Sequence, residues 1–128
     1  MLRRAIPILA LVLACNSSSS PRLTGTLNYD LVTINGQALP AASGGNLVVR
    51  GGATLDACGR FVLSQVDTLP SSATSTFQAV DGSWTMKGDS LRLTTRVSQS
   101  TYSGTVIASE LTLVPAASPN EIWVYHRH

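Results

Sequence analysis

The stretch Leu91-Arg92-Leu93-Thr94-Thr95-Arg96-Val97 alternates apolar and polar side chains along its whole length. Successive side chains of a β-strand point to opposite faces of its sheet. The pattern therefore predicts a strand that buries its odd-numbered residues and turns its two arginines outward. Immediately before it, Lys87-Gly88-Asp89 has the composition of a tight turn.

The same kind of short β-rich run recurs on both sides of this strand, and no window shows the period of a helix. Strands are expected at residues 29–34, 47–50, 53–55, 60–63, 76–80, 83–86, 101–107, 110–114 and 121–127. Asn35-Gly36 predicts a reversal, and Asp56–Gly59 a type I turn that ends in a left-handed glycine. Asp81-Gly82 is the clearest signal for a two-residue hairpin. Gly51-Gly52 predicts a bulge or bend, and residues 41–45, 67–72 and 115–120 are expected to be loops.

Hairpin-length links between so many strands predict an all-β, antiparallel up-and-down meander. A meander must bury one face and protect its two edge strands, and closure into a barrel of about 8–10 strands achieves both. A β-sandwich is the main alternative.

The N-terminus has the organisation of a secretory signal. Arg3 and Arg4 precede an apolar run from Ala5 to Ala14, which is too short for a span of about 20 residues. The following Val12-Leu13-Ala14-Cys15 resembles the lipobox of bacterial lipoproteins. This resemblance implies a signal peptide over residues 1–14 and acyl chains on Cys15 that anchor the protein to a membrane.

Residues 15–26 then form a polar tether, and residues 27–128 form the folded domain. Asn16 stands where Asp often retains such lipoproteins in the inner membrane, so the resemblance favours an outer-membrane anchor facing the periplasm or the cell surface. If Cys15 is acylated, Cys58 is left as a thiol in an exposed turn, without an intramolecular disulfide.

Charge and motif content argue against several functions. Of nine Lys and Arg residues, two lie in the leader, and the remaining seven equal the seven Asp and Glu, so the mature charge is zero. Nucleic-acid binding needs clustered Lys and Arg side chains, so it is not expected. The sequence lacks Gly-x-Ser-x-Gly, and its two histidines, His126 and His128, sit at the C-terminus, where a frayed end explains them better than a metal site. We expect no enzyme activity, no cofactor and no metal.

The strand and turn pattern resembles that of small bacterial lipocalin-like lipoproteins over residues 27–127. The matching pieces are Tyr29-x-Leu31, Ile34-Asn35-Gly36, Leu39-Pro40, Leu55 to Phe61, Gly82-x-Trp84, Gly88-Asp89-x-Leu91-x-Leu93, Tyr102-x-Gly104, Glu110-Leu111-Thr112-Leu113 and Trp123-Val124-Tyr125-x-Arg127. The resemblance implies a lipocalin-like barrel with an open mouth that often holds a small apolar ligand.

Five large side chains are expected to line the barrel interior and any ligand cavity: Phe61, Phe77, Trp84, Leu93 and Tyr102. A barrel of eight strands can hold one small ligand or be filled by its own side chains. In the second case the protein would instead be a structural or interaction lipoprotein of the envelope. An outward-facing Trp123 and Tyr125 would then be a candidate contact patch for a protein partner or the membrane surface.

Overall fold

The computed structural model describes residues 25–69 and 74–128, which form ten β-strands and no helix. The strands are β1 (Leu27–Ile34), β2 (Gln37–Ala38), β3 (Ala41–Ser43), β4 (Asn46–Leu55), β5 (Arg60–Thr68), β6 (Ser75–Lys87), β7 (Ser90–Thr95), β8 (Thr101–Ile107), β9 (Glu110–Pro115) and β10 (Trp123–Arg127). A helix capable of crossing a membrane is not found within these residues. The expected signal peptide, Cys15 and most of the tether lie outside the described residues.

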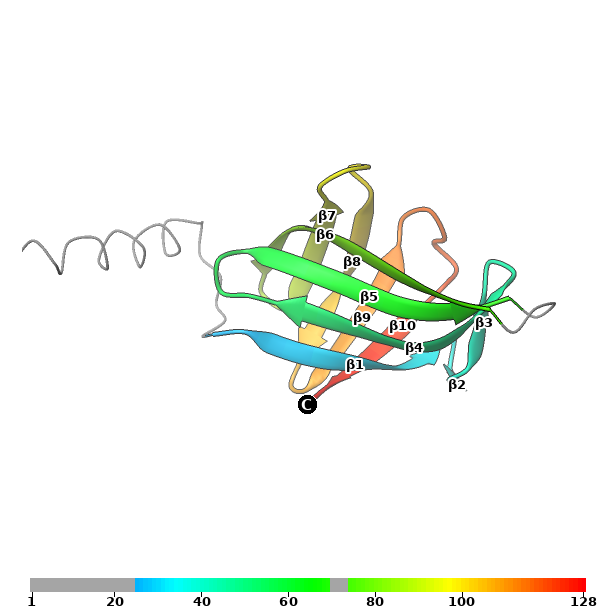
Figure 1. Cartoon of the computed structure of the whole chain (residues 1–128). Helices are drawn as coiled ribbons and strands as arrows, with labels where there is room; N and C mark the ends of the chain where they lie inside the picture. The colour runs from blue at the N-terminus through cyan, green and yellow to red at the C-terminus, as the bar shows by residue number, and fades with distance from the viewer. Residues whose placement is uncertain (1–24, 70–73) are drawn as a thin grey trace, which may run out of the picture.

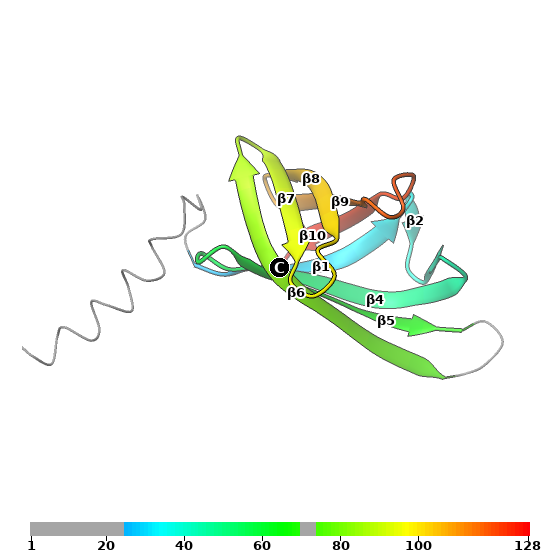
Figure 2. The same ribbon diagram turned by 90° about the horizontal axis from the view of Figure 1, so that it is seen from above.

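Eight of the strands close into an antiparallel up-and-down barrel, which confirms the predicted fold class (Figures 1 and 2). The meander from β4 to β10 pairs each strand with the next. Strand β1 closes the ring because it pairs with β4 through Leu27–Asp30 and with β10 through Tyr29–Ile34. The short strands β2 and β3 extend β1 and β4 at one rim.

The two ends of the barrel differ. The end formed by the β4–β5, β6–β7 and β8–β9 turns is filled by a core of inward-facing side chains. Its members share almost complete burial and include Tyr29, Leu55, Phe61, Trp84, Leu91, Leu93 and Leu111. The opposite end, where β10 begins and β5 finishes, is the more open one.

The turn Asp56–Gly59 connects β4 and β5 as predicted, with Gly59 at a φ of 88° and its N–H donating to the Asp56 carbonyl over 3.2 Å. Asn35 and Gly36 also have positive φ values, of 55° and 80°, at the predicted reversal. Lys87 and Ser90 face each other at the end of the β6–β7 hairpin.

The predicted hairpin at Asp81-Gly82 is wrong, because β6 continues through both residues without interruption, from Ser75 to Lys87. Gly82 faces inward, and a Cβ atom there would collide with the Thr94 carbonyl and lie 2.9 Å from the Phe61 ring. The glycine therefore permits a close approach of β7 to a bent β6 instead of a chain reversal. Asp81 accepts hydrogen bonds from the Arg96 side chain, at 3.2 and 3.3 Å.

Three smaller expectations also need correction. Residues 41–43 form β3 instead of a loop, because they pair with the start of β4. The irregularity in β4 lies between Val48 and Arg50, and the strand passes through Gly51-Gly52 without a break. Strand β5 extends to Thr68, so only the end of the expected 67–72 loop remains, and residues 70–73 lie outside the described part. Val97 follows the end of β7 and is 83% exposed.

Candidate functional site

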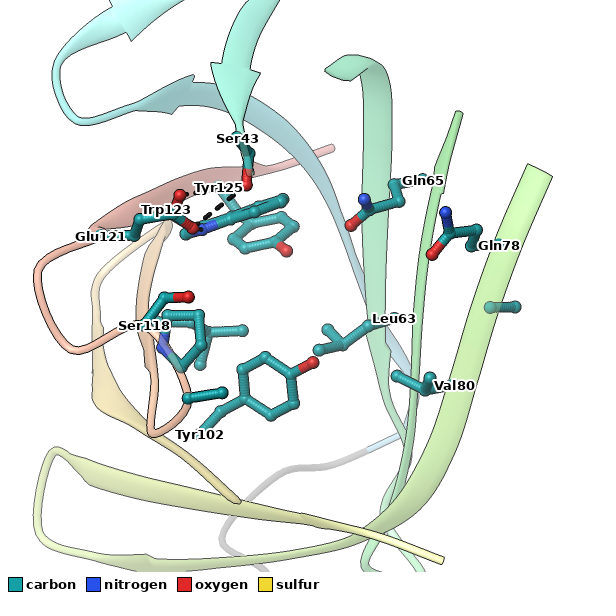
Figure 3. A pocket seen from close by; sticks show the side chains of 14 residues that line it. Ser43, Leu63, Gln65, Gln78, Val80, Tyr102, Ser118, Glu121, Trp123 and Tyr125 are labelled. Carbon is teal, nitrogen blue, oxygen red and sulfur yellow. Dashed lines mark hydrogen bonds between the residues drawn. The ribbon is translucent and has the colours of Figure 1, made fainter. Parts of the chain in front are cut away.

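A partly open pocket of about 270 Å³ lies at the open end of the barrel (Figure 3). One wall comes from the paired strands β5 and β6, through Leu63, Gln65, Gln78 and Val80. The other wall comes from β8, β9, β10 and the loop before β10. Its members include Tyr102, Leu113, Pro115, Ser118, Glu121, Trp123 and Tyr125, and Ser43 of β3 completes the rim.

A buried carboxylate organises the β5–β6 wall. Asp67 is 6% exposed, and its two oxygens accept hydrogen bonds from two glutamine amides. Gln65 Nε2 donates to Oδ1 over 2.8 Å, and Gln78 Nε2 donates to Oδ2 over 3.2 Å. Since a buried charge is tolerated only when it is hydrogen-bonded, these contacts hold both amides in fixed orientations.

A second carboxylate lies on the opposite wall. Both Glu121 oxygens lie 3.1 Å from the Ser43 hydroxyl, and Oε1 also accepts from the Trp123 indole N–H over 3.1 Å. These bonds connect the β3 extension to the start of β10. They place a negative charge at the rim of the pocket.

Two tyrosines reach the pocket from β8 and β10. Burial raises the pKa of Tyr125 well above its ordinary value, and the neighbouring Tyr102 raises it further. Burial also raises the pKa of Tyr102 and, in the core, that of Tyr29, where the effect is partly offset by Arg127. All three phenols are therefore held in the neutral form at neutral pH.

These shifts predict a loss of stability in alkali. Above about pH 10, a tyrosine in the unfolded chain releases its proton, whereas buried Tyr125 keeps it. The unfolded state then binds fewer protons than the folded state, so the free energy of unfolding falls as pH rises, by up to about 1.4 kcal/mol per pH unit for this group. Urea unfolding at pH 8 to 11.5 should show the decline. Tyr125→Phe should flatten it, and an equally steep decline in that variant would contradict the assignment.

The structure separates the five side chains that were expected to line the interior. Tyr102 lines the pocket. Phe61, Trp84 and Leu93 are almost completely buried in the core at the other end. Phe77 is 69% exposed on the outside of the barrel, so its expected interior position is wrong. Residues 77 and 84 are an odd number apart on one continuous strand and therefore lie on opposite faces.

The structure excludes the alternative in which Trp123 and Tyr125 face outward as a contact patch. Both are buried, at 8% and 3% exposure, and both line the pocket, whereas Ile122 is exposed. Sequence reasoning also missed Gln65 and Gln78. Alternate residues of a strand share one face, so the buried Phe61 and Leu63 on β5 could have indicated that Gln65 also faces inward.

The C-terminal histidines each contact a carboxylate of a neighbouring strand. His126 Nε2 lies 3.4 Å from Glu110, and His128 Nε2 lies 2.9 Å from Asp30. The expected frayed end is not observed, because the His128 N–H donates to the Asn28 carbonyl over 3.1 Å. Within residues 25–69 and 74–128, no three His, Cys, Asp or Glu side chains group as metal ligands.

Cys58 is disulfide-bonded, so the expectation of a thiol in the β4–β5 turn is not met. The chain has two cysteines. An intrachain disulfide of Cys58 and a thioether-linked lipid on Cys15 are consequently alternatives that exclude each other in one molecule.

Comparisons with protein families, with curated proteins and with solved structures found no match to this chain.

Proposed function

We propose that this protein is a bacterial envelope lipoprotein whose lipocalin-like barrel binds a small, largely apolar ligand in the pocket at its open end. The observation that carries the proposal is the pocket itself. Side chains of Leu63, Val80, Leu113 and the aromatic residues of β8 and β10 border it, with a few fixed polar groups among them. Concave sites of this composition are the usual form of small-molecule sites.

The position of the pocket fits a tethered protein. Strand β1 begins at the same end of the barrel as the β4–β5 turn (Figure 1), whereas the residues that line the pocket lie toward the other end. A lipid anchor upstream of β1 would therefore be attached through the tether to the closed end and would leave the pocket end of the barrel unobstructed. Asn16 after Cys15 favours an anchor in the outer membrane.

Blocking the pocket should abolish ligand binding. Val80 is an inward-facing, 40% exposed residue of the pocket wall, so Val80→Trp should fill the space without entering the core. The full-length protein is titrated with the neutral apolar dye N-phenyl-1-naphthylamine, whose fluorescence rises in apolar surroundings. We expect the affinity of Val80→Trp to fall about tenfold or more.

Val62→Trp is the matched control, because Val62 lies on the neighbouring strand, is 44% exposed and does not border the pocket. Its dye affinity should equal that of the unmodified protein. Equal binding by all three proteins, or no dye binding at all, would contradict the proposed function. Thermal unfolding of both variants establishes that the barrel is intact.

The anchor is tested separately on the two cysteines. Expressed in a bacterium, the chain should lose residues 1–14 and gain the mass of its acyl chains on Cys15, and it should partition into detergent. Cys15→Ser should abolish the cleavage, the added acyl mass and the detergent partitioning. Cys58→Ser should leave all three intact. Recovery of a water-soluble protein with a Cys15–Cys58 disulfide would exclude the lipid anchor.

The alternative function is an envelope interaction protein without a ligand. The exposed apolar residues Val62 and Phe77 on the outside of β5 and β6 favour it. Two results together would support this alternative: the dye does not bind, and Phe77→Ser abolishes binding to a specific envelope protein that the unmodified protein binds.

A further inference from the structure

We infer that the pocket selects a protonated amine with an apolar body, and disfavours anions such as fatty acids. This inference rests on the proposed ligand-binding function and specifies its ligand class. It follows from the polar atoms that the walls present to the pocket.

The two glutamine amides present hydrogen-bond acceptors. Each Nε2 group donates one of its two N–H bonds to Asp67, and the Oε1 carbonyl oxygens of Gln65 and Gln78 remain for a ligand. Figure 3 shows both amides directed toward the open space, with the oxygens nearer its middle than the nitrogens. These oxygens favour a ligand that brings donors, and an ammonium group carries only donors.

The opposite wall supplies negative charge. The Glu121 carboxylate accepts bonds from Ser43 and Trp123, but two carboxylate oxygens offer about four acceptor positions, so capacity remains. The described residues that line the pocket include no Lys, Arg or His. A bound carboxylate would thus face Glu121, and Asp67 behind the amides, without a compensating cation.

The aromatic residues favour the same ligand. Tyr102 lies across the open space from Trp123 and Tyr125 (Figure 3). The faces of such rings attract cations, and their apolar area accommodates the body of the ligand. Acceptors, negative charge and aromatic rings therefore converge on one ligand class.

The test compares four ligands that share one apolar body. Calorimetric titrations of the full-length protein use 4-phenylbutylamine, its N,N,N-trimethyl derivative, 4-phenylbutanol and 4-phenylbutyrate at pH 7. We expect the amine to bind about tenfold more tightly than the alcohol, with the butyrate weakest. The trimethyl derivative keeps the charge but lacks N–H donors, so it should fall between the amine and the alcohol.

Glu121→Gln should reduce the preference for the amine over the alcohol by about fivefold. Glu110→Gln, at the closed end of the barrel, should have no effect on any of the four affinities. Butyrate binding as tight as that of the amine, or an undiminished amine preference in Glu121→Gln, would overturn the inference. Binding of the alcohol without any amine preference would leave the proposed function standing, whereas binding of none of the four would count against both.

Discussion

Gly82→Val is expected to prevent the barrel from folding. At this inward-facing position a Cβ atom would overlap the carbonyl of Thr94 and lie 2.9 Å from the Phe61 ring. Thr94 pairs with β6 on one side and with β8 on the other, so its backbone cannot move away without breaking those ladders. Overlap with backbone on this scale costs about 4 kcal/mol or more, a large part of the stability of a small domain. Circular dichroism and urea unfolding measure the loss.

Gly52→Ala is the control, because Gly52 also lies within a strand of the same barrel. Its Cβ atom would lie 3.3 Å from the Tyr29 carbonyl and 3.6 Å from the Ser64 hydroxyl, so a shift of a few tenths of an ångström accommodates it. We expect a change of at most about 1 kcal/mol in its free energy of unfolding. A Gly82→Val protein as stable as Gly52→Ala would show that β7 does not approach β6 as closely as described.

Local patterns were sufficient to predict the class of the fold. Alternation in β7 identified a half-buried strand, and the left-handed residues at Asn35-Gly36 and Gly59 identified two of the turns. The hairpin prediction at Asp81-Gly82 failed because this dipeptide occurs in two different structural settings. A glycine can reverse the chain, or it can admit a neighbouring strand, and only the long-range contact with Thr94 decides between them.

That single error also explains much of what was missed at the site. A continuous β6 places Gln78 and Val80 inside and Phe77 outside, whereas a hairpin at 81–82 would have joined Phe77 and Trp84 on one face. The Asp67 network depends on the register that sets Gln65 opposite Gln78. Register across strands is a property of pairing, and the sequence of one strand does not contain it.

Trp84→Ala is expected to cost about 3–5 kcal/mol in the free energy of unfolding. The side chain is 4% exposed in the closed end, so its removal leaves a cavity that water cannot readily fill. Its indole N–H also donates to the Asp56 carbonyl over 3.0 Å, and its backbone N–H to the Gly59 carbonyl over 2.9 Å. The variant thus loses core volume and leaves the Asp56 carbonyl in the β4–β5 turn without the indole donor. Urea unfolding measures the loss.

Trp123→Ala provides the comparison, since it removes the same side chain from the other end of the same barrel. One side of Trp123 already borders the pocket, so the substitution enlarges an existing space instead of creating a closed one. We expect it to cost at least about 1 kcal/mol less than Trp84→Ala. Trp84→Phe, which keeps most of the ring volume and loses the indole donor, should fall below both alanine variants in cost. Equal losses for the two alanine variants would contradict the looser packing around Trp123 at the pocket end of the barrel.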